Sequence, residues 1–193
     1  MSVPYGFISF DRVAFHLING TWTSPFLDAV MPVISDIHKH HWFTFGVAPA
    51  GLGLYLWKGR ARALRVLVVM GIAMGVCDLI SYRVIKPLVA RPRPEYSGIG
   101  AILRVPPGGA MGFPSNHSTN AGAAASVLSV AYPAASWVFW TMAALMAYSR
   151  VYCGAHYPGD VVAGLLLGGL LSWPWALLML GPTASGGSKK KRR

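Results

Sequence analysis

The chain has 193 residues, of which 54% are hydrophobic and 12% are charged. A soluble domain carries about 25% charged residues, so the composition excludes an ordinary soluble domain and indicates a single membrane-embedded domain. The formal net charge is +11, but we expect no nucleic-acid partner because the basic residues flank apolar runs, as in cytoplasmic loops of membrane proteins. They form two groups: Lys58, Arg60, Arg62 and Arg65 in a short loop, and Lys189, Lys190, Lys191, Arg192 and Arg193 in the tail.

The N-terminal stretch YGFISFDRVAFHLI is apolar but is interrupted by Asp11 and Arg12. This pattern is typical of an amphipathic helix lying in the membrane interface and not of a cleavable signal peptide. Residues 24–35 predict a second surface helix, with Ser24 as its N-cap and Pro25 at its first position. The alternative is that residues 24–35 form a short additional span.

Five apolar runs approach the length of about 20 residues that a membrane-spanning helix requires. They cover residues 41–57, 63–88, 117–132, 134–150 and 157–180. The predicted fold class is therefore all-α, a polytopic membrane helix bundle with five or six transmembrane helices and N-terminal amphipathic interface helices. We expect one membrane-embedded domain over residues 1–182 and a flexible basic C-terminal tail over residues 183–193.

Small residues recur within the predicted spans at the spacing that brings helices close together in lipid. Gly71 and Gly75 form one G-x-x-x-G pair, Gly164 and Gly168 form another, and residues 121–126 read AGAAAS. These patterns predict tight helix packing.

The basic loop predicts the orientation of the bundle. If residues 58–65 are cytoplasmic, the alternating spans place three polar stretches at the outer face and the basic tail inside. These stretches are residues 86–95, 114–120 and 149–160. The long loop 91–116, rich in proline and glycine, joins the first two, and loops of this length are often functional.

The first and third polar stretches carry the cations Lys86, Arg93 and Arg150, with Arg91 two residues before Arg93. Charges near a bilayer usually face a partner or a water-filled site. A guanidinium fork suits phosphate oxygens, and lysine adds a point charge. Side chains that merely snorkel to the interface are the alternative, but three cations with few acids nearby favour an anion site.

The second polar stretch, FPSNHSTN at 113–120, predicts a helix start after Pro114. Either Ser115 or Ser118 can cap this helix, and its free N–H groups would then form an anion site at the outer face. His117 lies at this point. It is either a structural histidine or, beside a bound anion, a candidate proton donor.

In the third stretch, His156 and Asp160 are four residues apart, the spacing of one helical turn. A carboxylate there can accept the Nδ1–H of the imidazole and leave Nε2 free as nucleophile or base. Because YPG within this stretch is awkward for a regular helix, a helix cap could make the contact instead. A salt-bridged pair that only stabilises the turn is the other alternative.

Two histidines and a carboxylate also suit a metal, but the nearby cations would oppose a divalent ion. The other acidic candidates are Asp28, Asp36, Asp78 and Glu95. We therefore expect no metal and no cofactor. Cys77 and Cys153 lie in apolar surroundings and predict no disulfide framework.

Together the three stretches resemble the signature of the type 2 phosphatidic acid phosphatase family, which includes membrane lipid phosphatases and soluble vanadium haloperoxidases. Its three parts are Lys-x6-Arg-Pro, Pro-Ser-Gly-His and Ser-Arg-x5-His-x3-Asp. They match, in order, Lys86 with Arg93–Pro94, then Pro114–Ser115–Asn116–His117, then Ser149–Arg150 with His156 and Asp160. Asn116 replaces the usual glycine. We expect this change to be tolerated because asparagine keeps the backbone N–H and is the best non-glycine residue at positive φ.

By this resemblance, His156 attacks phosphorus to form a phosphohistidine, Asp160 orients it, and His117 protonates the leaving group and then activates water. The implied phosphate-binding residues are Lys86, Arg93, Ser115, Asn116 and Arg150. Together they provide electrostatic preorganisation.

The resemblance implies a metal-independent lipid phosphatase. The compact chain and the positive-inside pattern indicate a bacterial inner membrane, and the predicted topology places the site on its outer face. A polyprenyl diphosphate is weakly favoured as substrate over phosphatidylglycerophosphate, phosphatidate or a lipid A phosphate. A lipid phosphotransferase is an alternative enzyme, and an anion channel or transporter a non-enzymatic one. A channel is disfavoured because Asp78 and Arg83 are the only further candidates for intramembrane charges. A haloperoxidase is disfavoured because that branch is soluble. The oligomeric state stays open.

Overall fold

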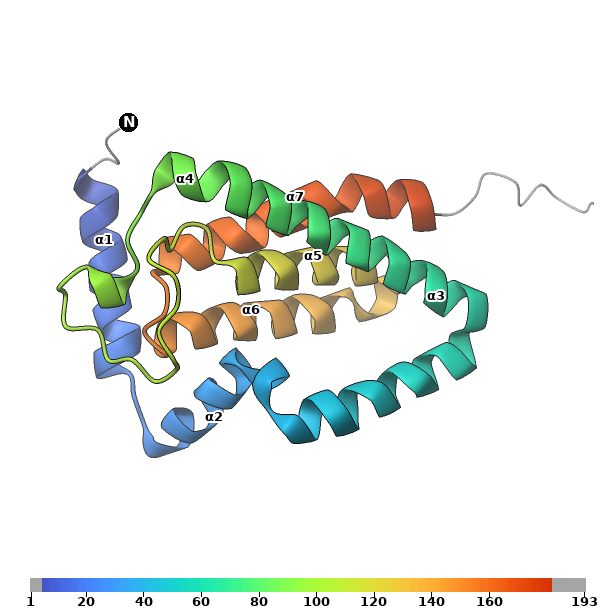
Figure 1. Cartoon of the computed structure of the whole chain (residues 1–193), viewed down its shortest axis with the longest axis horizontal. Helices are drawn as coiled ribbons and strands as arrows, with labels where there is room; N and C mark the ends of the chain where they lie inside the picture. The colour runs from blue at the N-terminus through green and yellow to red at the C-terminus, as the bar shows by residue number, and fades with distance from the viewer. Residues whose placement is uncertain (1–4, 182–193) are drawn as a thin grey trace, which may run out of the picture.

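The computed structural model describes residues 5–181, and the predicted basic tail lies outside the described residues. This part of the chain is mostly helical. Its longest connection, residues 90–115, contains a 3₁₀ turn at Pro94–Tyr96 and an isolated β-bridge between Pro92 and Met111. The α-helices are α1 (Tyr5–His16), α2 (Pro25–Ser35), α3 (Ala48–Ile80), α4 (Lys86–Val89), α5 (Asn116–Ala131), α6 (Ser136–Tyr152) and α7 (Pro158–Leu180). The all-α prediction is confirmed. Helices α3, α5, α6 and α7 run along the long axis, while α1 crosses one end (Figure 1).

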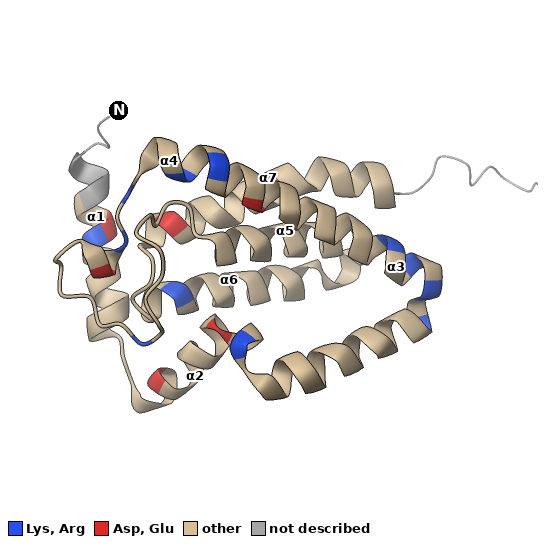
Figure 2. Cartoon of the chain, viewed as in Figure 1, with Lys and Arg blue, Asp and Glu red and all other residues tan. Residues whose placement is uncertain are grey.

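Helix α3 bends sharply at Arg60, where the backbone leaves helical geometry with φ 44° and ψ −125°. Two arms run back from this bend (Figure 1), and they correspond to the predicted runs 41–57 and 63–88. The predicted basic loop is therefore a bend in an otherwise continuous helical segment. Basic residues gather at the bend, whereas residues of both charges occur toward the opposite end (Figure 2).

Two helical stretches of the described chain are long and apolar enough to cross a membrane, Phe43–Val89 and Pro158–Leu180. The first has 47 residues, about twice the length of one crossing, and it contains the bend. Helices α5 and α6 have 16 and 17 residues, near the lower limit of about 17 for a span. The number of crossings therefore stays a prediction.

The α2 prediction is confirmed at its N-terminus. Ser24 is the N-cap, and its side-chain oxygen accepts a hydrogen bond of 3.2 Å from the backbone N–H of Leu27. Pro25 occupies the first helical position.

Helices α5 and α7 pack with their backbones close together. A Cβ atom added at Gly164 would lie 2.7 Å from the carbonyl oxygen of Ser115, and one at Gly168 would overlap the carbonyl oxygen of Thr119. The predicted close packing is therefore confirmed for this glycine pair. For Gly71 and Gly75 it is wrong within this chain, since nothing lies within 4 Å of a Cβ atom at either position.

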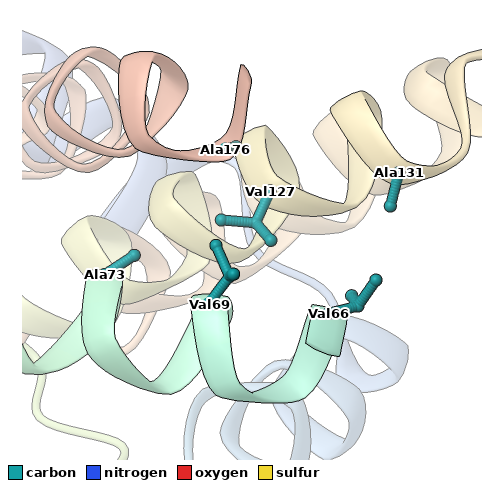
Figure 3. Packing of buried hydrophobic residues seen from close by; sticks show 6 residues of the cluster. All are labelled: Val66, Val69, Ala73, Val127, Ala131 and Ala176. Atoms are coloured by element: carbon teal, nitrogen blue, oxygen red, sulfur yellow. The ribbon is translucent and has the colours of Figure 1, made fainter. Parts of the chain in front are cut away.

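The rotation of α3 explains the difference between the two glycine pairs. This helix turns a different face to the bundle, with Val66, Val69 and Ala73 buried against α5 and α7 (Figure 3). Their partners are Val127 and Ala131 of α5 and Ala176 of α7. This apolar core occupies the half of the bundle nearer the bend and leaves the other end for polar groups.

We expect Gly168→Ala to lower the melting temperature of the protein in detergent. The new methyl group would force α5 and α7 apart, and overpacking of this kind costs about 1–3 kcal/mol. Gly71→Ala is the matched control and should leave the melting temperature unchanged or slightly higher, because it adds a methyl group in open space and improves helix propensity. Equal melting temperatures for the two variants would contradict the packing.

Candidate functional site

The three polar stretches meet at the end of the bundle opposite the bend. The ammonium group of Lys86 donates hydrogen bonds to the carbonyl oxygens of Pro114 at 2.9 Å and Met111 at 3.3 Å. The backbone N–H of Ser115 donates to the carbonyl oxygen of Asp160 at 3.0 Å. The convergence predicted from the order of the apolar runs is therefore confirmed.

His156 lies in the connection between α6 and α7, and its side chain is only 1% exposed. Asp160 is the third residue of α7, and its Oδ2 accepts a hydrogen bond of 3.0 Å from the backbone N–H of Tyr157, the N-cap residue. The same Oδ2 lies 3.5 Å from Nδ1 of His156, slightly beyond a normal hydrogen bond. The two side chains thus meet through a helix cap, because α7 begins after His156.

Burial lowers the pKa of His156 from its ordinary value of 6.5 to about 4. The neighbouring carboxylate of Asp160 raises this pKa but does not offset burial, and the positive charges of Arg93 and Arg150 lower it further. The imidazole is therefore neutral at physiological pH, which is the state that a nucleophile or general base requires.

Arg93 and Arg150 act on this histidine through their charges, and Lys86 lies near Arg93 and Asp160. Lys86 and Arg150 are 4% and 5% exposed, and Arg93 packs its guanidinium group against Gly108, where a Cβ atom would overlap it. Within the described residues, the Nε atoms of Arg93 and Arg150 and the Oγ of Ser115 are buried without a hydrogen-bond partner. Unpaired buried donors are costly, so this cluster suits an anion with several acceptor oxygens.

The helix that carries His117 begins as predicted but is not capped as predicted. Ser115 is the N-cap of α5, yet its hydroxyl makes no capping bond, and the hydroxyl of Ser118 also lacks a partner among the described residues. The prediction that one of these hydroxyls caps the helix is therefore wrong. Asn116 is the first residue of α5 and is not among the residues with positive φ, so the replacement of glycine needs no left-handed backbone.

The C-terminal end of α2 covers one side of the site, which the sequence did not predict. Arg150 donates to the hydroxyl of Ser35 at 2.6 Å and to the carboxylate of Asp36 at 3.1 Å. The ring of His38, in the turn that follows, lies 5.5 Å from the ring of His117. The only signal in the sequence is the concentration of charged residues and histidines directly after the apolar helix 24–35.

Asp11 and Arg91 support Asp160 from the side away from His156. One guanidinium N–H of Arg91 donates to Asp160 at 2.8 Å and the other to Asp11, whose second oxygen accepts from the backbone N–H of Gly159 at 2.7 Å. The guanidinium group also lies over the ring of Tyr157, 4.2 Å from its centre. The sequence showed Asp11 only as an interruption of an apolar stretch, but it is buried and part of the site.

The PAP2 superfamily model matches residues 62–182, which contain all the signature positions. The chain belongs to the PAP2 superfamily. A lipid A 4′-phosphatase of Porphyromonas gingivalis is 30% identical over 82% of the chain and 68% of the relative. An undecaprenyl-diphosphatase of Sulfolobus acidocaldarius is 29% identical over 86% of the chain and 77% of the relative.

The fold is also found among solved structures. A transmembrane PAP2 type phosphatidylglycerolphosphate phosphatase from Bacillus subtilis superimposes with a TM-score of 0.68 at 23% identity, covering 94% of this chain and 90% of that one. These matches confirm the predicted family and, with it, the assignment as a membrane lipid phosphatase, a hydrolase of lipid phosphates.

We expect Arg91→Lys to lower kcat roughly tenfold and leave KM within about twofold, because lysine keeps the charge but cannot bridge two carboxylates as a planar fork does. Phosphate release and the melting temperature in detergent are the measurements. The control is Arg12→Lys, at the exposed neighbour of Asp11, which should change neither. A purely structural role would instead lower the melting temperature and leave kcat per folded protein unchanged.

The lowered pKa of His156 also predicts a pH dependence of stability. The unfolded chain binds a proton at this side chain near pH 6.5, whereas the folded protein binds it only near pH 4. The stability contributed by the neutral side chain is therefore fully present above the unfolded pKa and is lost as the pH falls through this window. Between about pH 7.5 and about pH 5, wild type should lose more of its melting temperature than His156→Gln, which does not titrate. If wild type and His156→Gln lost the same number of degrees in melting temperature, the lowered pKa of His156 would be contradicted.

Proposed function

We propose that the enzyme hydrolyses the phosphate of a lipid at the outer face of a bacterial cytoplasmic membrane, through a phosphohistidine on His156. The observation that carries this proposal is a cleft of about 590 Å³ between α3, α5 and α6. Its polar end is lined by His38 and His117, and its far end by apolar side chains such as Leu128 and Phe139. A cavity with one polar and one apolar end suits an amphiphile.

The cleft follows one face of α5. Residues at positions 116, 117, 120, 121, 124, 125 and 128 line it, and this range covers about 18 Å at the rise of an α-helix. A lipid whose phosphate lies at the N-terminus of α5 would therefore place its chain along the bundle, between α3 and α6.

In the first chemical step, Nε2 of His156 attacks phosphorus, the bond from phosphorus to the lipid oxygen breaks, and His117 gives a proton to that oxygen. Asp160 holds the Nδ1–H and balances the positive charge that develops on the ring. In the second step, His117 takes a proton from water, which attacks phosphorus. The phosphorus–nitrogen bond breaks, and inorganic phosphate leaves.

The oxygens of phosphorus carry negative charge throughout both steps. Lys86, Arg93 and Arg150, the hydroxyl of Ser115 and the backbone N–H of Asn116 would bind these oxygens. A phosphate there would compete with Asp36 for Arg150, which is paired with that carboxylate in this structure. Metal independence stays a prediction, and its physical basis is that these cations balance the charge.

The orientation follows from the positive-inside rule. The bend of α3 would lie in the cytoplasm, the two arms of α3 and helices α5, α6 and α7 would make five crossings, and α1 and α2 would lie at the outer interface. The charges at the bend are exclusively basic, which supports this arrangement (Figure 2).

We expect His156→Ala to lower phosphate release from lipid phosphates by at least a thousandfold, since it removes the nucleophile. Rapid quenching of wild type with a ³²P-labelled lipid phosphate should trap a label that survives base and is lost in acid, and the variant should carry none. His41→Ala, at an exposed histidine, is the control and should retain both activity and label. A labelled His156→Ala protein would exclude His156 as the nucleophile.

A further inference from the structure

Three polar side chains that the mechanism does not use meet at the polar end of the cleft. The side-chain amide of Asn116 donates a hydrogen bond of 2.8 Å to the carboxylate of Asp78. The amide of Asn120, one turn along α5, donates to both oxygens of the same carboxylate at 3.3 and 3.2 Å. All three residues line the cleft, as does His117.

The carboxylate determines how both amides are oriented. An ionised carboxylate only accepts hydrogen bonds, so each asparagine must turn its NH2 group toward Asp78. The Oδ1 atoms of Asn116 and Asn120 are thereby left as acceptors, and both are buried without a partner among the described residues. Buried acceptors without donors are rare and unfavourable.

A purely structural role explains only part of this arrangement. Asp78 does link α3 to α5, but a single asparagine would be enough for that link, and it would not leave two unpaired oxygens. Within the described residues, no cation forms an ion pair with Asp78. The cluster therefore offers acceptors and negative charge directly beside the cationic phosphate site.

We propose that Asp78, Asn116 and Asn120 form a headgroup subsite that accepts hydrogen bonds from hydroxyl or amide N–H groups next to the substrate's phosphate. This proposal rests on the proposed function, because it presumes a lipid phosphate bound at His156. It specifies the substrate class as a lipid phosphate with a donor-bearing headgroup, such as a phosphorylated sugar or glycerol headgroup.

The subsite discriminates against the other candidate substrates. A prenyl diphosphate presents only C–H groups beside its phosphates, so both Oδ1 atoms would stay unpaired, and its second phosphate would be repelled by Asp78. Phosphatidate presents ester oxygens, which only accept hydrogen bonds and therefore cannot pair with the Oδ1 atoms of the two asparagines. The proposed subsite therefore favours a donor-bearing headgroup over the polyprenyl diphosphate that the sequence weakly favours, while one relative of the chain is an undecaprenyl-diphosphatase.

The test compares kcat/KM for lipid phosphates in detergent, using the full-length protein. Phosphatidylglycerophosphate and phosphatidate with identical acyl chains differ by one glycerophosphate unit, which gives the former a hydroxyl group beside its terminal phosphate. Farnesyl diphosphate represents the prenyl class. Wild type should prefer the hydroxylated lipid at least tenfold over each of the others, because a site built for a donor rejects an analogue without one.

Asn120→Leu, which keeps the number and branching of the side-chain heavy atoms but removes the acceptor, should reduce this preference about tenfold. Asp78→Asn should do the same, because a neutral amide no longer determines the orientation of its neighbours. Leu128→Ala, at the apolar end of the cleft, is the matched control and should affect all three lipids alike. Inhibition by vanadate, which occupies only the phosphate site, should stay within about twofold in Asn120→Leu if the catalytic site is intact.

A wild type that hydrolyses all three lipids equally, or that prefers farnesyl diphosphate, would overturn the subsite and leave the proposed function standing. An equal loss on all three lipids in Asn120→Leu, with weaker vanadate inhibition, would show that the cluster only holds α3 to α5 and would also overturn it. Absence of hydrolysis by wild type with every lipid phosphate would contradict the proposed function itself.

Discussion

The carboxylate of Asp160 is the group on which the geometry of the site depends. It is completely buried, and a buried charge persists only when it is paired and hydrogen-bonded. One oxygen binds the N-terminus of α7 and faces His156, while the other binds Arg91. Its backbone carbonyl accepts from Ser115 at the start of α5. A single residue thereby joins the proposed nucleophile, the N-terminal ends of two helices and, through Arg91, helix α1.

Close helix packing makes this convergence possible. Because Gly122, Gly164 and Gly168 lack side chains, the parallel helices α5 and α7 approach until their backbones nearly touch. Their N-termini then lie together, and the positive ends of two helix dipoles add to the charges of the nearby lysine and arginine side chains. Burial of the histidine in this environment keeps it neutral, so packing determines both where the anion binds and the protonation state of the group beside it.

Local patterns in the sequence were sufficient for the helices and for the residues at signature spacing. They were not sufficient for pairs formed across long stretches of chain, such as Asp11 with Arg91 and Asp36 with Arg150. These pairs depend on how each helix is rotated about its axis. The glycine pairs illustrate the same limit, because two identical four-residue spacings gave a tight contact in α7 and an open face in α3.

Helix α5 contributes residues to the binding of all three parts of the proposed substrate, its phosphate, its headgroup and its chain. Its N-terminus lies among the cations, its first two turns carry the two asparagines held by Asp78, and Ala121, Ala124 and Ala125 also line the cleft. The phosphate, headgroup and chain of the substrate would contact these successive parts of α5 in that order. Because all these contact residues belong to one rigid helix, the enzyme would select substrates by the distance between their phosphate and their donor group. A lipid with a suitable donor one turn too far along would lose either the asparagine contacts or its position for attack by the histidine.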